Sequence, residues 1–146
     1  MNPAMDFATL TLGRRPNRFL MAPQGLCQAA TPHAESPTFE APPDRLLDAI
    51  RRVALAEPRT ALVSERELGL KFVQRSRIFR LPDTIDVRVV TLGDGRAAPA
   101  FYGRAKYGFR DFGVNEARIR RWLTALPVAL KGASMIRPDR ASAAAS

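Results

Sequence analysis

The spacing of apolar positions predicts a first helix near residue 44. A proline pair precedes Asp44, which we expect to cap the helix, and Pro58 closes the segment. Apolar side chains recur between them at helical spacing, at Leu46, Leu47, Ile50, Val53 and Ala54. This pattern predicts an amphipathic helix over roughly residues 44–56.

A second helix is predicted near the carboxyl end. Asn115 opens the segment and is placed to cap it, and Pro127 is expected to end it. Apolar residues fall at positions i, i+3, i+4 and i+7, at Ile119, Trp122, Leu123 and Leu126. We expect this helix to pack on a sheet through Trp122.

The chain between the helices alternates between apolar and polar positions. Three longer strands are predicted over residues 70–80, 84–92 and 98–107, with a short strand at 61–63 and a glycine-rich turn at 93–95. These segments predict an antiparallel meander, because no strand–helix–strand alternation demands parallel strands. The fold class is therefore α+β: an antiparallel sheet of about four strands, with one helix before it and one helix after it.

The two ends of the chain differ from the middle. Residues 1–43 contain seven prolines and show no helical or strand periodicity, so they are interpreted as a Pro-rich N-terminal arm, partly packed on the core. Residues 44–130 form the predicted α+β domain. Residues 131–146 end in an Ala/Ser run and are expected to form a flexible C-terminal tail.

Composition excludes several kinds of chemistry. A chain of 146 residues can bury a sufficient core without a disulfide or a metal. One cysteine and one histidine cannot build a Cys/His zinc site, so no metal and no cofactor is predicted. We interpret Cys27 as a packed side chain and His33 as a surface residue.

No part of the sequence resembles a membrane span or a secretory signal. Charged residues or proline interrupt every apolar run before the roughly 18 residues that a span requires. The first residues lack a basic segment followed by a long apolar one. The expected location is cytoplasmic.

The net charge of +9 is concentrated in one part of the chain. Residues 70–110 carry nine basic and three acidic side chains, an excess that favours an anionic neighbour. The predicted strands place a basic face on the sheet, formed by Arg75, Arg77 and Arg88 with Arg104 and Lys106. Asp83 and Asp86 are expected to pair with the arginines at positions 77, 80 or 88.

The segment that joins the last strand to the second helix is the most distinctive. Its glycines permit tight turns, and helix-terminal amides near cationic side chains suit a phosphate or a carboxylate. The candidate ligand-binding residues are Arg104, Lys106, Gly108, Asp111, Gly113, Asn115 and Arg118. An alternative remains open, in which Asp111 only pairs with Arg118, Asn115 only caps the helix and the glycines only form turns.

The order of these features resembles a family known as domain of unknown function 1499. The matching residues are Arg15, Pro16, Asn17, Arg75, Ser76, Pro82, Asp83, Tyr102, Arg104, Gly108, Asp111, Gly113, Asn115 and Arg118. The resemblance spans about residues 15–126 and implies one compact domain of bacteria and plastid-bearing organisms, with no assigned activity. This chain departs from the family pattern at Gly103 and Ala105, which replace serines, and at Lys106, which replaces an arginine.

The sequence leaves three functions open. We favour a non-catalytic module that binds a small anion, an acidic protein or an anionic lipid surface. Nucleic acid ranks lower, because Tyr102 beside Arg104 is the one good stacking candidate. An enzyme acting on an anionic small molecule would use Asp111, but a carboxylate among arginines stays ionised and shuttles protons poorly. A structural or scaffold protein is the third hypothesis.

Overall fold

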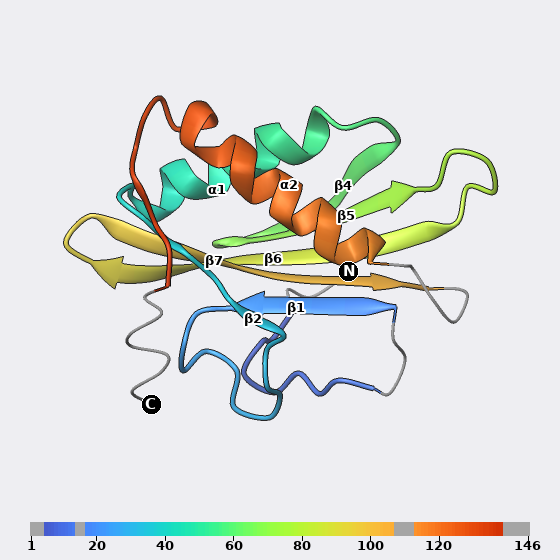
Figure 1. Cartoon of the computed structure of the whole chain (residues 1–146), viewed down its shortest axis with the longest axis horizontal. Helices are drawn as coiled ribbons and strands as arrows, with labels where there is room; N and C mark the ends of the chain where they lie inside the picture. The colour runs from blue at the N-terminus through green and yellow to red at the C-terminus, as the bar shows by residue number, and fades with distance from the viewer. Residues whose placement is uncertain (1–4, 14–16, 107–112, 139–146) are drawn as a thin grey trace.

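A computed structural model describes residues 5–13, 17–106 and 113–138, and all structural statements refer to them. Two helices lie on one face of a mixed, mostly antiparallel sheet with the strand order β2-β1-β7-β6-β5-β4 (Figure 1). The strands are β1 (Arg18–Ala22), β2 (Ala34–Glu35), β3 (Thr38–Phe39), β4 (Thr60–Arg66), β5 (Gly69–Arg75), β6 (Pro82–Gly93), β7 (Arg96–Ala105) and β8 (Met135–Ile136). The helices are α1 (Pro43–Leu55) and α2 (Val114–Ala129).

The predicted meander is present as β4, β5, β6 and β7, which pair antiparallel in sequence order. The predicted strand over residues 70–80 is shorter, because β5 ends at Arg75 and the chain then turns through residues 76–81. This β5–β6 loop and the start of α2 lie at one end of the molecule, and the β6–β7 turn lies at the other (Figure 1).

The prediction of about four strands with a helix before them was wrong in its detail. Three strands, β1 to β3, precede α1, and β8 follows α2, so α1 lies inside the strand order. β1 pairs antiparallel with β7 and parallel with β2, which makes the sheet mixed. The strands at residues 34–35 and 38–39 are too short to show periodicity. The four residues from Phe19 to Ala22 are buried on both faces of the sheet, so β1 shows no alternation between apolar and polar positions that the sequence could reveal.

Helix α1 confirms the predicted apolar face, with Leu46, Leu47 and Ile50 buried. Its cap differs from the prediction. Pro42 is the N-cap residue, no side chain caps the helix, and Asp44 lies in the first turn instead. Proline at the start of the helix makes this favourable, because the missing N–H would have no partner there. Asp44 still complements the positive end of the helix dipole.

Helix α2 buries the predicted stripe of Ile119, Trp122, Leu123 and Leu126. It does not end at Pro127 but continues to Ala129. The hydrogen-bond ladder resumes beyond the proline, since the Leu130 N–H donates to the Leu126 carbonyl at 2.8 Å. The helix is capped by Gly113 and not by Asn115, which is buried in the first turn.

The sheet is covered on both faces. On the helix side, Trp122 lies edge-on to Phe72 and Phe101, with ring centroids 5.6 and 6.4 Å apart. On the opposite face, Phe7 from the amino-terminal segment packs against β1 and β7. Along β7 the residues from Ala97 to Gly103 are all buried, as expected of a strand with cover on both sides. Among the described residues, no helix is apolar over the length that a bilayer crossing needs.

Candidate functional site

The sheet separates the predicted ligand-binding residues onto two faces. A Cβ on Gly103 would point at Asn115 on the helix side, and the next residue, Arg104, extends from the opposite face. Arg118 lies with Asn115 on the helix side. The structure therefore does not bring Arg104 together with Asn115 and Arg118. Gly108 and Asp111 lie outside the described residues.

Arg118 is buried, with a relative exposure of 4%. Its Nε donates to Gln74 Oε1 at 2.6 Å, and its Nη1 donates to Asn115 Oδ1 at 2.7 Å. Its Nη2 donates to Asp83 Oδ2 at 3.0 Å and forms a salt bridge with that carboxylate. All three guanidinium nitrogens are engaged. We call Gln74, Asp83, Asn115 and Arg118 the Arg118 network.

Asn115 joins this network to the amino-terminal segment. It is fully buried, and its Nδ2 donates to the Asn17 carbonyl at 3.4 Å. Gly113 has a φ of +78°, so the chain enters α2 through a backbone conformation that suits glycine. The predicted capping role of Asn115 is wrong, because its carboxamide bonds Arg118 and Asn17 and does not cap the helix.

Glu57, which the sequence did not single out, extends the network toward solvent. Gln74 Nε2 donates to Glu57 Oε1 at 2.9 Å and to Thr60 Oγ1 at 2.7 Å. Arg121 donates to both carboxylate oxygens of Glu57, at 2.6 and 2.8 Å. Burial raises the pKa of Glu57, but the hydrogen bonds from Arg121 and Gln74 outweigh it and lower the pKa to about 2. Glu57 therefore stays ionised across the neutral range.

The network has the properties of a structural connection. It joins α2 to β5, β6 and the segment before β1, and each of the three guanidinium nitrogens of Arg118 donates within the protein. A buried arginine that already bonds a carboxylate and two amide oxygens is poorly placed to bind a ligand, because breaking the ion pair would leave a desolvated carboxylate. This arrangement favours the alternative in which Asn115 and Arg118 stabilise the fold and do not bind a ligand.

A second charged cluster lies on the opposite face of the sheet. Asp86 is 1% exposed, and it accepts a hydrogen bond from Arg104 at 2.8 Å and lies 3.6 Å from Lys71 Nζ. The Arg104 guanidinium lies 4.7 Å from the centre of the Tyr102 ring, and Arg18 donates to the Tyr102 hydroxyl at 2.8 Å. Asp86 thus offsets part of the basic charge on this face.

The predicted basic face is present in part. The register places Arg75, Arg88 and Arg104 on β5, β6 and β7, on the face away from the helices. Arg77 does not belong to it, because it lies in the β5–β6 loop. The predicted partners of Asp83 and Asp86 were wrong. Residues distant in sequence hold these two carboxylates.

The β5–β6 loop, residues 76–81, exposes two large apolar side chains that are adjacent in sequence. Ile78 and Phe79 are each 78% exposed, and Leu81 is 43% exposed. The sequence interpretation missed this feature, because strand-forming residue types at 78 and 79 extended the predicted strand. Two adjacent large apolar residues between arginines break the alternation of a strand, and that break is the sequence feature that could have indicated a loop at residues 76–81.

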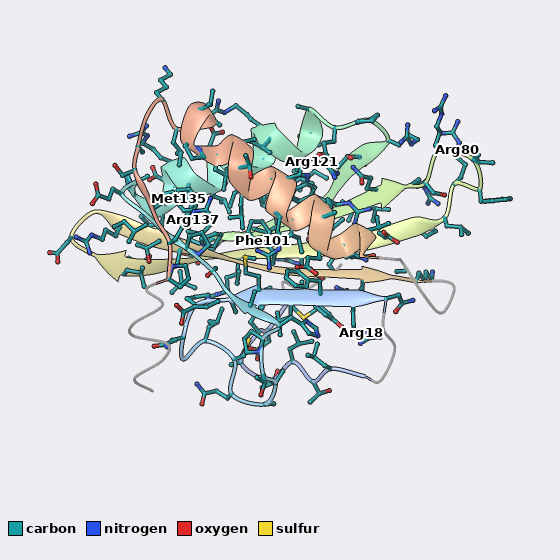
Figure 2. The ribbon with its side chains drawn as sticks, in the orientation of Figure 1. Arg18, Arg80, Phe101, Arg121, Met135 and Arg137 are labelled. Carbon is teal, nitrogen blue, oxygen red and sulfur yellow. The ribbon has the colours of Figure 1, made fainter. Side chains whose placement is uncertain are left out.

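Several pockets lie elsewhere, and two of them adjoin β1. One of about 230 Å³ lies between β1, α2 and β8, and its lining includes Glu35, Arg120, Met135 and Arg137, the last two labelled in Figure 2. The other, of about 260 Å³, includes Cys27, whose pKa is raised by burial, as expected of an inert thiol. Within the described ranges no group of three or more His, Cys, Asp or Glu side chains is arranged to hold a metal ion.

Comparison with known families gives one match. A family model described as a protein of unknown function, DUF1499, matches residues 10–126. The match covers most of the chain and includes both helices up to Leu126. Comparison with curated proteins gives no match. The motif residues Asn17, Asp83, Asn115 and Arg118, which lie far apart in the sequence, meet in the Arg118 network and its contact to the Asn17 carbonyl.

Proposed function

The chain belongs to the DUF1499 family, and we propose that it is a non-catalytic module that binds an acidic partner surface through its β5–β6 loop. The observation that carries this proposal is the placement of cations at the loop. Residues 75–82 include three arginines and no carboxylate. Arg77 and Arg80 are exposed, and no described carboxylate forms a salt bridge with either of them.

The contrast with two other candidate cations, Arg104 and Arg118, supports this choice. Arg118 and Arg104 each have a carboxylate partner, and both partners are largely buried. Releasing either arginine to a ligand would leave a desolvated carboxylate behind, which is unfavourable. The loop arginines can meet an external anion without that cost. An acidic surface at the loop is therefore better supported than a small anion at the start of α2.

The shape of the loop favours a surface partner over a small ligand. Its tip, residues 77–80, projects beyond the sheet, and Figure 2 shows Arg80 at that end of the molecule, far from Met135 and Arg137. A projecting tip offers no concavity that could enclose a small molecule. A broad acidic surface can contact several of its side chains together.

The test is a binding measurement on a surface coated with polyglutamate, at several salt concentrations. Charge reversal at the tip, Arg77→Glu with Arg80→Glu, should weaken binding by about tenfold or more at low salt. The matched control is Arg66→Glu with Arg96→Glu, which makes the same charge change at exposed positions beside the other end of the sheet. Equal losses in both variants would indicate a net-charge effect and would refute a site at the loop.

A further inference from the structure

We propose that the acidic partner surface is the headgroup layer of an anionic lipid bilayer, into which the loop tip inserts Ile78 and Phe79. This inference rests on the proposed function, because it uses the same loop. It adds a chemical class of partner and a mode of contact. Four properties of the loop support this mode of contact: its exposed apolar side chains, its flanking arginines, its internal hydrogen bonds and its place at one end of the sheet.

The apolar side chains at the tip are the first observation. Ile78 and Phe79 are each 78% exposed and adjacent in sequence, and Leu81 adds a third partly exposed side chain. Single exposed apolar residues are common, but a contiguous group of large ones on a projecting loop marks an interaction site. Here the group lies at the outermost part of the hairpin (Figure 1). It is therefore placed to enter a soft apolar layer that faces this end of the molecule.

The arginines of the loop indicate that this apolar layer is the interior of an anionic lipid bilayer. Arg77 and Arg80 directly flank the apolar pair, and Arg75 lies at the base of the loop. Apolar side chains that insert below the headgroups, with guanidinium groups at the level of the phosphates, are typical of interfacial binding to anionic membranes. Arginine suits this position because its planar guanidinium bonds phosphate oxygens in a bidentate manner.

The same residues fit other acidic partners less well. A single-stranded nucleic acid would stack its bases on aromatic rings, but Ile78 offers no ring and Phe79 is the only aromatic residue of the tip. An acidic protein surface would bind the arginines and leave no partner for two large apolar side chains. A bilayer offers a partner to both the arginines and the apolar side chains of the tip, since its charged headgroup layer and its apolar interior are a few ångströms apart.

Internal hydrogen bonds hold the loop in shape. The Leu81 N–H donates to Ser76 Oγ at 2.9 Å, and the Ser76 N–H donates to the Leu81 carbonyl at 3.0 Å. Arg75 Nη1 donates to the Arg80 carbonyl at 3.0 Å. Arg80 has a φ of +56°, which closes the turn. Because the base of the loop is ordered before binding, less conformational entropy is lost on insertion.

The surroundings of the loop agree with a membrane-facing end. The start of α2 lies at the same end of the molecule (Figure 1), and its first residue, Val114, is 46% exposed. Lys106, at the end of β7, is exposed there as well. At the opposite end, the β6–β7 turn carries Asp94 and Arg96, whose charges offset each other, near its exposed Leu92. The two ends therefore differ in charge while both expose apolar side chains, which provides an internal control.

The experiment measures co-sedimentation of the full chain with vesicles of phosphatidylcholine mixed with phosphatidylserine, and with vesicles of phosphatidylcholine alone. We expect binding to the anionic vesicles that falls with rising salt, and weak binding to the neutral ones. The double variant Ile78→Ser and Phe79→Ser should bind the anionic vesicles about tenfold or more weakly, since each apolar group that enters the bilayer adds to the free energy of membrane binding. The matched control, Val63→Ser with Leu92→Ser, removes two apolar side chains of 45% and 46% exposure elsewhere and should bind as the unmodified chain does.

A second measurement detects insertion directly. In a Cys27→Ser background, an environment-sensitive dye is attached to Phe79→Cys or, as the control, to Leu92→Cys. The dye at position 79 should shift to the blue on anionic vesicles and be quenched by a lipid-borne quencher, and the dye at position 92 should do neither. Thermal unfolding of each variant establishes that it is folded.

The outcomes separate the two proposals. Vesicle binding that needs the arginines but not Ile78 and Phe79, without a dye shift, would overturn insertion and leave the acidic-surface function in place. Binding to polyglutamate without binding to anionic vesicles would have the same meaning. Failure on both surfaces would overturn both proposals.

Discussion

The carboxamide of Asn115 fills the space that a side chain at position 103 would need. A Cβ built on Gly103 would lie 2.5 Å from Asn115 Oδ1 and 3.1 Å from its Cγ. Real Cβ atoms do not approach other atoms that closely, and Asn115 is fully buried, so its amide has little room to move. Gly103 is thus coupled to the buried amide that accepts a hydrogen bond from Arg118.

Replacing Gly103 with alanine should destabilise the protein. The added methyl group forces Asn115 to move, and such overpacking costs about 1–3 kcal/mol of unfolding free energy. Urea unfolding monitored by the fluorescence of the buried Trp122 measures the loss. In an Asn115→Ala background the same substitution should cost less than about 0.5 kcal/mol, because the clash is gone. Equal costs in both backgrounds would contradict the coupling.

Arg118→Met should be strongly destabilising. It leaves Asp83, Gln74 and Asn115 without their buried donor, and breaking a buried pair typically costs about 3–5 kcal/mol. Arg118→Lys keeps the positive charge and should recover part of the lost stability. The recovery should be incomplete, because a single ammonium cannot reach three separate acceptors with the same geometry. Thermal unfolding of both variants gives the order.

The control for Arg118 lies two residues further along α2. Arg120 forms an i,i+4 pair with Glu116, and both side chains are about half exposed. Arg120→Met should therefore cost at most about 1 kcal/mol. If Arg120→Met were as damaging as Arg118→Met, the buried network would not be the cause.

The sequence predicts most of the local structure but not the contacts that complete the site. The helical stripe of α2 was visible because Ile119, Trp122 and Leu126 repeat at helical spacing, and the structure buries all three. The continuation of α2 past Pro127 was not visible, because local rules stop a helix at proline. Packing of Leu126 and Leu130 in the core holds the last turn nevertheless.

The candidate site depends on pairings that no local pattern encodes. The sequence indicates Asn115 and Arg118 as candidates. It does not indicate Gln74 and Glu57, since these two residues lie on other elements in ordinary sequence surroundings. Which face of β7 carries Arg104 follows from register, and a shift of one residue would reverse it. Sequence periodicity therefore identified candidate residues without showing that they lie on opposite sides of the sheet.

His33 should contribute to stability through one ring nitrogen. The Leu20 N–H donates to His33 Nδ1 at 2.8 Å, and the ring stacks on Phe19 with centroids 5.6 Å apart. His33→Phe keeps a stacking ring but removes the acceptor, so a backbone donor of β1 loses its partner at a cost of about 0.5–1.5 kcal/mol. Chemical denaturation measures this difference. Amide exchange at Leu20 should quicken in the variant, and unchanged exchange there would contradict the assigned contact.

Glu57 should make part of the stability depend on acid pH. Its pKa is lowered from the ordinary 4.5 to about 2 in the folded protein, so the unfolded chain binds a proton first as the pH falls. The stabilisation is complete above about pH 4.5 and is lost as the pH falls through about 2.

Glu57→Gln tests this linkage directly. The substitution removes the charged acceptor of Arg121 and should cost about 1–2 kcal/mol at neutral pH, the lower part of the range for charged hydrogen bonds because Arg121 is half exposed. The difference in unfolding free energy between the original chain and Glu57→Gln should shrink as the pH is lowered from 5 toward 2. Asp48→Asn is the control, since Asp48 pairs with Arg51 and Arg52 on α1 and its own side chain is 54% exposed. A difference that stays constant with pH would show that Glu57 acts through packing and not through its charge.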